Sequence, residues 1–472
     1  MEISVIGAGY VGLTTAACLA EIGHNVFCAD NDTEKLNHLG NGRMPFYEPH
    51  LGGIVDRNRR AKRLEFGGTE EGIDRGRAIF ICVGTPPLEG GEADLSAIER
   101  VARVIAQRGR GYRLVIEKST VPVQTGHQLK RHLALFKTDE LEYDVASNPE
   151  FLREGAGVED FFHPDRLVVG VETPRALEQM REIYKPVLEQ TFACPVHSDC
   201  TRRNPPSRVP FVVTDINSAE LVKHASNSFL AMKISFINLV ANLCEVAGAD
   251  INRVAEGIGL DRRIGPAFLR PGIGFGGFCF PKDLQAFVRI AEKLGCDFSL
   301  LKEVERINLC RVDYFVEKVK RELWVLRGKR IGVWGLAFKP DTDDVRFAPS
   351  LAIIRRLLAE GAQVQAYDPR AAENAKRELP TVTYCSDLYE AARGTEAVLL
   401  MTEWNEFREV NWEQLRGLMD RPLIVDGRNA LSGDQLAGFG FHYVGIGCQE
   451  EVSRRELMSL NDRGGGLRRT GN

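Results

Sequence analysis

The residue with the clearest chemical signature is Cys279, which ends a glycine-rich stretch reading Arg-Pro-Gly-Ile-Gly-Phe-Gly-Gly-Phe-Cys-Phe over residues 270–280. The next residues, 281–283, open a helical pattern that ends near Gly295, and Pro281 suits a first helical position. Cys279 therefore lies just before a predicted helix N-terminus, where free amides, the helix dipole and Lys282 favour a thiolate. We predict a reactive thiol. The alternative is a structural cysteine after a turn, which is the interpretation we give the other ten cysteines.

Three polar residues could act together with this thiol. Asp283 follows Cys279 by four residues, so within a helix it can project toward the same space. Alternatively, it only complements the helix dipole. Lys223 and Asn227 are four residues apart in a long helical pattern over 216–247, so they share a face and can meet one ligand oxygen. Taken alone, Lys223 would be interpreted as a solvated helix lysine.

A dinucleotide site is predicted at the N-terminus. Gly7, Gly9 and Gly12 form G-x-G-x-x-G after an apolar strand and before a helical pattern over 13–21. Such glycines allow a tight turn, close approach to a pyrophosphate and close packing of helix on strand. Asp30 ends the next strand and can accept hydrogen bonds from a ribose diol; no arginine follows it, so we expect NAD rather than NADP. Ordinary turn glycines are the alternative.

A later strand end supplies one more candidate cofactor contact. Thr85 lies in Cys-Val-Gly-Thr-Pro-Pro, residues 82–87, at the expected carboxyl edge of the sheet. A simple strand-to-loop turn explains this segment equally well.

The elements that must position these residues alternate between strand and helix. To about Val169, short apolar runs alternate with helical patterns, which is typical of a parallel sheet wrapped by helices. The predicted strands are 3–6, 26–29, 78–83, 114–117 and 145–147. A second set begins at Lys329, with strands at 330–335 and 364–367 around a helix at 349–360.

The fold class expected is therefore α/β, with two Rossmann-like doubly wound domains joined by a long central helix and a helical segment. The predicted parts are an NAD-binding domain over 1–210, a central helical segment with the thiol loop and a dimer contact over 211–326, a second doubly wound domain over 327–460, and a disordered tail over 461–472.

Composition narrows the class of protein. A formal charge of -4 over 472 residues gives no reason to expect nucleic acid as a partner. Eleven irregularly spaced cysteines match neither a disulfide framework nor a paired Cys-x-x-Cys zinc site, so we expect no metal and a reducing cytoplasm. No apolar run reaches the ~20 residues of a membrane span, and the early nucleotide-binding pattern leaves no room for a signal peptide.

Several long motifs occur in an order that resembles the UDP-glucose/GDP-mannose dehydrogenase family from Met1 to about Gly447. They are Val-Ile-Gly-Ala-Gly-Tyr-Val-Gly from Val5, Glu-Lys-Ser-Thr-Val-Pro from Glu117, Asn-Pro-Glu-Phe-Leu-Arg-Glu-Gly from Asn148, the segment 223–233, the thiol loop, Gly-Leu-Ala-Phe-Lys-Pro from Gly335, and Thr342-Asp343-Asp344 with Arg346.

The resemblance implies a four-electron oxidation of a sugar C6 alcohol with two NAD, with UDP-glucose as the expected substrate. A base removes the alcohol proton as hydride leaves, and Cys279 attacks the resulting aldehyde to give a thiohemiacetal. A second hydride transfer yields a thioester, which water cleaves to the uronic acid. In this scheme Lys223 stabilises the oxyanion with help from Asn227.

The resemblance also assigns further site residues. Proton handling falls to Thr120, Glu150, Glu154 and Asp283, among which Glu154 and Asp283 are the chosen acid–base partners with their roles left open. Cofactor contacts are expected from Gly7, Gly9, Tyr10, Val11, Gly12, Asp30, Lys35, Thr85, Thr120, Glu154, Lys282 and Arg346. Substrate contacts are expected from Glu150, Phe151, Leu152, Arg153, Glu154, Lys223, Asn227, Arg263, Phe275, Gly276, Cys279, Phe338, Lys339 and Arg428.

Some of these roles have structural alternatives. Arg263 resembles the arginine that crosses a dimer interface into the neighbouring site, so a homodimer or higher homo-oligomer is expected. Any of the arginines could instead form a surface ion pair, and Glu150 could be purely structural. Phe278 stands where a serine usually precedes the thiol, and Leu239 where an acid often follows Ile-Asn. The polar stretch around 200–210 is longer than usual.

Three other functions stay open. A sibling enzyme would act on GDP-mannose or a UDP-N-acetylhexosamine. A two-electron hydroxyacid dehydrogenase of related architecture would not need Cys279. A nucleotide-sugar-binding protein without turnover is the third, although every catalytic position that the resemblance carries over is present.

Overall fold

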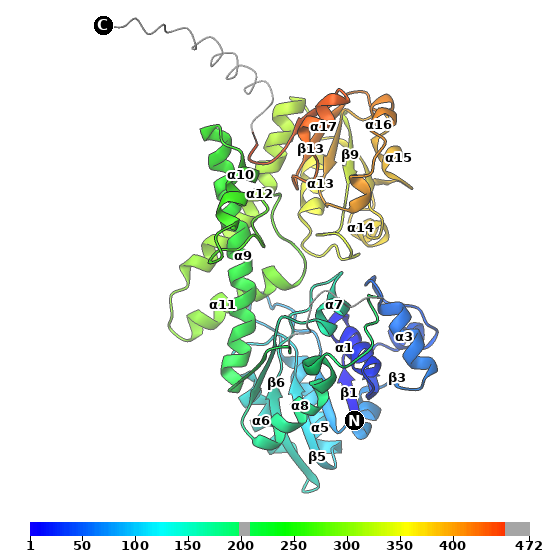
Figure 1. The fold of residues 1–472 in the computed structure, drawn as a ribbon, viewed down its shortest axis with the longest axis vertical. Coiled ribbons are helices and arrows are strands. Elements are labelled where there is room, and N and C mark those ends of the chain that lie inside the picture. Colours follow the sequence, from blue (N-terminus) through cyan, green and yellow to red (C-terminus); the bar gives the residue numbers. More distant parts are fainter. Residues whose placement is uncertain (198–207, 449–472) are drawn as a thin grey trace, which may run out of the picture. The chain divides into compact units, whose positions relative to one another are not determined.

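The computed structural model describes residues 1–197 and 208–448 (Figure 1). The chain forms two compact units, one made of Met1–Ser228 with Lys282–Phe298 and the other of Phe229–Pro281 with the residues from Ser299 onward. The predicted tail over 461–472 and most of the polar stretch around 200–210 lie outside the described residues.

The first unit contains an eight-stranded sheet in the order β3-β2-β1-β4-β5-β6-β7-β8. Its strands are β1 (Glu2–Ile6), β2 (Asn25–Ala29), β3 (Leu64–Gly67), β4 (Ala78–Ile81), β5 (Gly111–Glu117), β6 (Leu141–Ser147), β7 (Leu167–Val171) and β8 (Phe211–Thr214). All neighbours are parallel except β6 and β7, a reversal that the sequence did not predict. Every residue of β4 is buried, as expected for a strand covered on both faces.

Helices cover both faces of this sheet (Figure 1). They are α1 (Tyr10–Glu21), α2 (Thr33–Gly40), α3 (Leu51–Arg60), α4 (Thr69–Arg75), α5 (Ser96–Arg108), α6 (Thr125–Phe136), α7 (Gly157–Phe162) and α8 (Pro174–Glu189). One apolar cluster joins the sheet to α1, α3, α7 and α8. A second cluster joins it to α4, α5 and α6, so each face has its own core.

Two helices belong to both units. α9 (Ile216–Ala247) has the bounds predicted from its periodicity and passes from the first unit into the second after Ser228. α11 (Cys279–Lys293) begins two residues before the predicted Pro281, so Cys279 is its first residue rather than the residue before it. Proline is tolerated throughout a first helical turn, because those amides have no partner within the helix.

The second unit contains a six-stranded parallel sheet in the order β11-β10-β9-β12-β13-β14. The strands are β9 (Arg330–Trp334), β10 (Gln363–Tyr367), β11 (Thr383–Tyr384), β12 (Ala397–Leu400), β13 (Leu423–Asp426) and β14 (His442–Val444). The helices are α10 (Ile251–Gly259), α12 (Ser299–Leu323), α13 (Pro349–Ala359), α14 (Ala372–Glu378), α15 (Leu388–Ala392), α16 (Trp412–Leu418) and α17 (Gly433–Gly438), with a short 3-10 helix at Asn405–Phe407. Buried Trp334 stacks on Phe407 at 5.4 Å in its core.

Two doubly wound sheets confirm the predicted fold class. β8 pairs with β7 and so extends the first sheet beyond 210, the domain end expected from sequence. Among the described helices, only α9 has the length and hydropathy of a membrane span, a test that core helices of soluble proteins also pass. Its N-terminal half carries the buried polar side chains of Lys223 and Asn227, which suit a core helix.

Candidate functional site

The turn from β1 to α1 has the backbone geometry of a phosphate-binding loop. Gly7 has φ +107°, and a Cβ there would lie 2.6 Å from the Cys82 carbonyl oxygen. A Cβ at Gly12 would lie 1.7 Å from the Gly7 oxygen, so both positions require glycine for packing within the chain. A Cβ at Gly9 would meet no described atom within 4 Å. Gly9 is therefore explained by close approach of a ligand to the start of α1, where Tyr10 and Val11 lie.

Asp30 lies at the end of β2 and is held by three donors. The Ala8 amide donates to its Oδ2 at 2.7 Å, the Asp32 amide to its Oδ1 at 2.9 Å, and Lys35 Nζ lies 3.0 Å from Oδ2. Partial burial raises the pKa of Asp30, but these hydrogen bonds and the Lys35 charge outweigh it and leave the pKa below its usual value. The carboxylate is ionised at neutral pH and can accept hydrogen bonds from a ribose diol.

Replacing Asp30 by alanine is expected to weaken NAD binding by about 10- to 100-fold, since a hydrogen bond to a charged group contributes roughly 1.5–3 kcal/mol. Titration calorimetry with NAD measures the change. Glu34→Ala, which removes an exposed acid on the neighbouring helix, is the control and should bind NAD like the wild type. If Asp30→Ala bound NAD as tightly as the wild type, Asp30 would not be a ribose contact.

A buried glutamate that the sequence did not single out shapes the loop after β6. Glu48 accepts hydrogen bonds from the Tyr10 hydroxyl at 2.7 Å and from the Gly155 and Gly157 amides at 2.6 and 2.7 Å. It thereby ties the start of α1 to the loop that contains residues 150–154. A lone glutamate far from any motif gives no sequence signal for this role.

Lys223 and Glu150 form a buried ion pair at the start of that loop. Lys223 Nζ lies 2.9 Å from Glu150 Oε1 and 2.7 Å from the Glu150 carbonyl oxygen, with both side chains about 5% exposed. The other Glu150 oxygen accepts from the Leu152 amide at 2.6 Å. Glu150 therefore positions the Lys223 ammonium, which agrees with its structural alternative as much as with proton handling.

The rest of the loop lies around this pair. The Phe151 ring centre is 5.5 Å from Lys223 Nζ and 3.6 Å from the Arg166 guanidinium carbon. Arg153 is exposed and pairs with Asp160 at 2.6 Å, and half-buried Glu154 follows it in the loop.

A second buried set joins α9 to α11 within the first unit. Asn227 Nδ2 donates to Asp283 Oδ2 at 2.6 Å, and Lys282 Nζ lies 2.7 Å from Asp283 Oδ1. Burial raises the pKa of Asp283, but the charges of Lys282 and Lys223 outweigh it, so the pKa lies below its ordinary value and the carboxylate is ionised.

The same set reaches the strand ends of the first sheet. Lys282 Nζ also lies 3.4 Å from Thr85 Oγ1, which donates to the Thr120 carbonyl at 2.9 Å. The structure thus brings Lys223, Asn227, Asp283, Lys282, Thr85, Thr120 and Glu150 into one region of the first unit. This arrangement supplies an ionised base beside a fixed cation and an amide donor.

Two further residues of α9, Glu220 and His224, support this region and were not predicted. Glu220 accepts from the Gln124 and Gly126 amides, each at 2.7 Å, and so caps the start of α6. A ring nitrogen of His224 lies 2.7 Å from the Val121 carbonyl oxygen. Glu220 and His224 are four residues apart, as Lys223 and Asn227 are, and each lies three positions earlier in the helix. This spacing was the sequence signal that could have identified them.

Glu220 gives a pH-dependent contribution to stability. Burial raises its pKa to about 7, above the unfolded value near 4.3. The protonated form is favoured in the folded state, so this contribution is complete below the unfolded pKa and is lost as pH rises toward 7.

Between pH 5 and pH 8, the free energy of unfolding in urea should therefore fall by about 2 kcal/mol more for the wild type than for Glu220→Gln. Comparing the two proteins at each pH cancels the other titrating groups. An identical pH dependence would show that Glu220 titrates normally.

The thiol loop lies in the second unit, and its glycines are required by packing. Gly277 has φ +78°, and a Cβ there would lie 2.8 Å from the Phe338 ring. A Cβ at Gly276 would lie 2.4 Å from the Phe347 carbonyl oxygen. The Phe275 amide donates to Asn308 Oδ1 at 2.8 Å, and the Asn308 amide returns a bond to the Phe275 oxygen at 2.9 Å. These contacts fix the backbone that leads into Cys279, which is partly exposed.

Arg428 holds the same loop rather than lying open. Its guanidinium donates to the carbonyl oxygens of Gly274 and Phe338 at 3.1 Å and of Met401 at 2.8 Å. Lys339 Nζ lies 5.5 Å from the Phe338 ring centre. Phe338, Lys339 and Arg428 therefore lie close to the thiol loop within the second unit.

The remaining two arginines have acidic neighbours. Arg346 pairs with Asp344 at 2.6 Å, and its guanidinium carbon lies 4.5 Å from the ring centre of Phe278. Phe278 thus supports an arginine. Arg263 pairs with Asp261 at 2.6 Å, and its side chain is 88% exposed.

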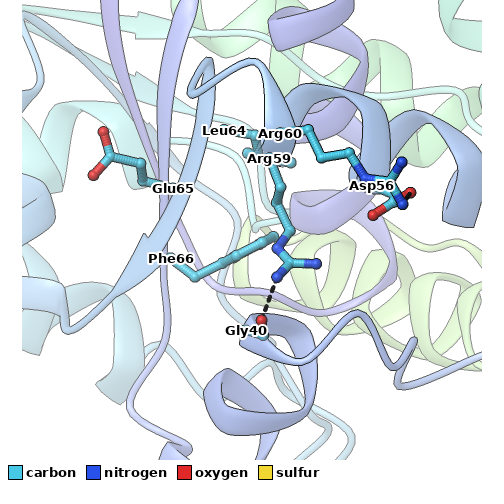
Figure 2. Close-up of a pocket in the computed structure, with 7 residues that line it drawn as sticks. All are labelled: Gly40, Asp56, Arg59, Arg60, Leu64, Glu65 and Phe66. Atoms are coloured by element: carbon cyan, nitrogen blue, oxygen red, sulfur yellow. Dashed lines mark hydrogen bonds and ion pairs between the residues drawn. The ribbon is translucent and has the colours of Figure 1, made fainter.

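The surface also has hollows that hold none of the predicted residues. One, of about 430 Å³, lies beside α2, α3 and β3 and is lined by Gly40, Asp56, Arg59, Arg60, Leu64, Glu65 and Phe66 (Figure 2). Arg60 pairs there with Asp56 at 2.7 Å, and Arg59 donates to the Gly40 carbonyl oxygen. Because its arginines already have protein partners, this hollow is not the candidate site.

Three domains of one family match the chain. The UDP-glucose/GDP-mannose dehydrogenase NAD binding domain matches residues 1–188, the central domain 217–309 and the UDP binding domain 332–433. A UDP-glucose 6-dehydrogenase of Bacillus subtilis is 41% identical over 96% of this chain and 99% of its own. One from Rhizobium meliloti is 42% identical over 95% and 99%.

Solved structures agree with these relatives. A UDP-glucose dehydrogenase from Pyrobaculum islandicum has a TM-score of 0.84 at 39% identity and covers 95% of this chain and 98% of its own. A UDP-D-ManNAc dehydrogenase from Pyrococcus horikoshii has a TM-score of 0.79 at 26% identity, over 95% and 99%.

Proposed function

The chain belongs to the UDP-glucose/GDP-mannose dehydrogenase family and is an NAD-dependent oxidoreductase, and from this premise we propose that it oxidises the C6 alcohol of UDP-glucose to a carboxylate. The observation that carries the chemistry is the buried set in which the Lys223 ammonium, the Asn227 amide and the ionised Asp283 lie together. The identity of 41–42% to UDP-glucose 6-dehydrogenases carries the choice of sugar.

In the first oxidation, Asp283 or Glu154 accepts the proton of the C6 hydroxyl, while Lys223 and Asn227 stabilise the negative charge that develops on its oxygen. NAD, when bound, accepts the hydride of each oxidation, and Gly9 and Asp30 fit its pyrophosphate and ribose. The fixed Lys223–Glu150 pair means that the cation need not reorganise during the reaction.

In the second oxidation, the Cys279 thiolate adds to the aldehyde carbon to form a thiohemiacetal, and loss of a second hydride leaves a thioester. Water then attacks the thioester carbon, supplies the second carboxylate oxygen and releases the thiol. Cys279 suits this role because it is the first residue of α11, where the free amides of a first helical turn stabilise negative charge.

Within the first unit, Glu150 to Glu154 are proposed as substrate contacts. Within the second unit, the proposed substrate contacts are Phe275, Gly276, Phe338 and Lys339. Lys339 supplies charge for a phosphate. Arg428 acts by holding the thiol loop, because its nitrogens already donate to backbone oxygens. Arg346 is proposed to face the nicotinamide side.

The direct test measures NADH formed from limiting UDP-glucose by the purified protein, with GDP-mannose and UDP-N-acetylhexosamines in parallel. Two NADH per UDP-glucose, and little from the others, is the expected result. Two NADH formed only from another nucleotide sugar would show that the protein carries out the same four-electron oxidation on that sugar. One NADH per sugar would indicate a two-electron dehydrogenase, and no NADH with tight nucleotide-sugar binding would indicate a protein without turnover.

We also propose that the protein is cytoplasmic and forms a homodimer through α9. Five large apolar residues repeat along one face of α9 and are 46–88% exposed: Phe229, Phe236, Leu239, Leu243 and Val246. Leu239, where an acid often occurs in the family, extends this face. An apolar face of this length suits an interface between two copies of the helix, and exposed Arg263 could then reach the partner's site.

The double substitution Phe236→Glu and Leu243→Glu is expected to shift the protein from dimer to monomer in light scattering coupled to gel filtration, because it places charges at the centre of the apolar face. Leu135→Glu, at an equally exposed leucine of α6, should leave the dimer intact. A double variant that remains dimeric would show that this face of α9 is not the dimer interface.

A further inference from the structure

A cluster of metal-ligand type lies in the first unit, apart from the residues used above. Nε2 of His163 lies 3.3 Å from Sγ of Cys194, and Nδ1 of His197 lies 3.9 Å from the same sulfur. All three candidate ligand atoms are within 4.8 Å of one another, and within the described residues no other such group occurs. His163 follows α7, whereas Cys194 and His197 follow α8, so the chain brings them together from 31 residues apart.

These separations match a tetrahedral zinc site. Bonds of about 2.0–2.3 Å to nitrogen and sulfur place neighbouring ligand atoms roughly 3.3–3.8 Å apart. The observed separations of 3.3 Å, 3.9 Å and at most 4.8 Å exceed these values by at most about 1.5 Å, so small side-chain movements would let the three atoms bind one ion. One thiolate and two imidazoles are also donors that bind zinc, whereas hard cations such as Mg²⁺ and Ca²⁺ prefer oxygen donors.

Gln190 fixes the orientation of His163. Its Nδ1 lies 2.9 Å from Gln190 Oε1, and the Gln190 amide nitrogen donates to the carbonyl oxygens of Phe162 at 2.9 Å and Val187 at 2.7 Å. Because that nitrogen serves two acceptors, the Gln190 oxygen must face His163 and accept its Nδ1–H. The lone pair of Nε2 is then directed at Cys194, as in a metal-ligating histidine.

His197 has the same arrangement in looser form. Its Nδ1 faces the Cys194 sulfur, and its Nε2 lies 4.0 Å from Glu159 Oε1. Each imidazole thus presents one nitrogen to the thiol and the other to an oxygen acceptor, the pattern that sets the tautomer and basicity of zinc ligands. The Phe192 ring, 5.8 Å from that of His163, covers one side.

We propose that His163 Nε2, Cys194 Sγ and His197 Nδ1 bind one Zn²⁺ that clips the segment after α8 to the end of α7. The fourth position is taken by water or another donor. On binding, Cys194 loses its thiol proton to solvent while both imidazoles stay neutral. This proposal goes against the absence of a metal expected from the sequence, which rested on the lack of a paired Cys-x-x-Cys motif.

Metal content is the test. Tag-free protein loaded with Zn²⁺ and passed through gel filtration should contain about one zinc per chain by mass spectrometry. Cys194→Ser should contain almost none, whereas Cys310→Ser, at an exposed cysteine of α12, should match the wild type. Loading wild type with Co²⁺ should give thiolate-to-cobalt charge-transfer absorption, which does not depend on any variant folding.

Stability gives a second readout that is independent of activity. A strong chelator should lower the unfolding temperature of the wild type and of Cys310→Ser, and added Zn²⁺ should restore it. Zinc-loaded wild type that retains no metal, or a Cys194→Ser variant that retains the wild-type amount, overturns the proposal.

Discussion

Replacing Cys279 by serine is expected to reduce the yield from two NADH to at most one per UDP-glucose, with the second oxidation slowed at least about 10³-fold. The serine hydroxyl is a much weaker nucleophile than a thiolate, so the covalent adducts of the second oxidation do not form. The groups proposed for the first oxidation, Lys223, Asn227 and Asp283, are unchanged. Single-turnover NADH formation with limiting sugar measures both effects.

Cys296→Ser is the matched control, because Cys296 is exposed just beyond the end of the same helix. It should give two NADH at the wild-type rate. Two NADH at that rate from Cys279→Ser would contradict the thioester route. No NADH at all from a variant that still binds UDP-glucose would show that Cys279 also acts in the first oxidation, against the role assigned here.

Replacing Lys223 by methionine is expected to lower kcat for NADH formation by about 10²–10³-fold, because the oxyanion loses its fixed cation. KM for UDP-glucose should change much less. The substitution also leaves the Glu150 carboxylate buried without its partner, which costs about 3–5 kcal/mol of stability. A loss of activity alone would therefore be ambiguous.

Adding Glu150→Gln to Lys223→Met separates the two effects. With both charges removed, most of the stability should return, measured as the free energy of unfolding in urea, while kcat stays low. Lys320→Met, which breaks an ion pair with Glu360 on the surface, is the control and should keep kcat. If the double variant recovered wild-type kcat, Lys223 would be a structural residue.

The fold was predictable where periodicity is strong. The bounds of α9 and the positions of β1, β2, β4 and β9 follow from apolar patterns and flanking glycines. β7 could not be predicted as antiparallel, because its apolar run is the same whichever direction it takes beside β6. β8 was missed because it is short, half exposed and preceded by a polar stretch.

The site was predictable only in its reactive groups. Gly7, Asp30 and Cys279 could be predicted because their residue types and their positions beside strand and helix ends indicate a function. Glu48 and Glu220 act through backbone amides more than 90 residues away, and such partners leave no local pattern. The contact of Arg428 with the Gly274 carbonyl oxygen depends on tertiary packing and leaves no pattern in the sequence, whereas its predicted contact with the nucleotide stays a prediction.

The single helix α11 carries the nucleophile as its first residue and Asp283 one turn later. Residues four apart on a helix keep their Cβ atoms roughly 6 Å apart, and this spacing is set by covalent geometry and the helix itself. The distance between thiol and carboxylate therefore depends on one helical turn and not on the conformation of any loop. A substitution in the surrounding loops can change what binds beside these two groups without changing the spacing between them.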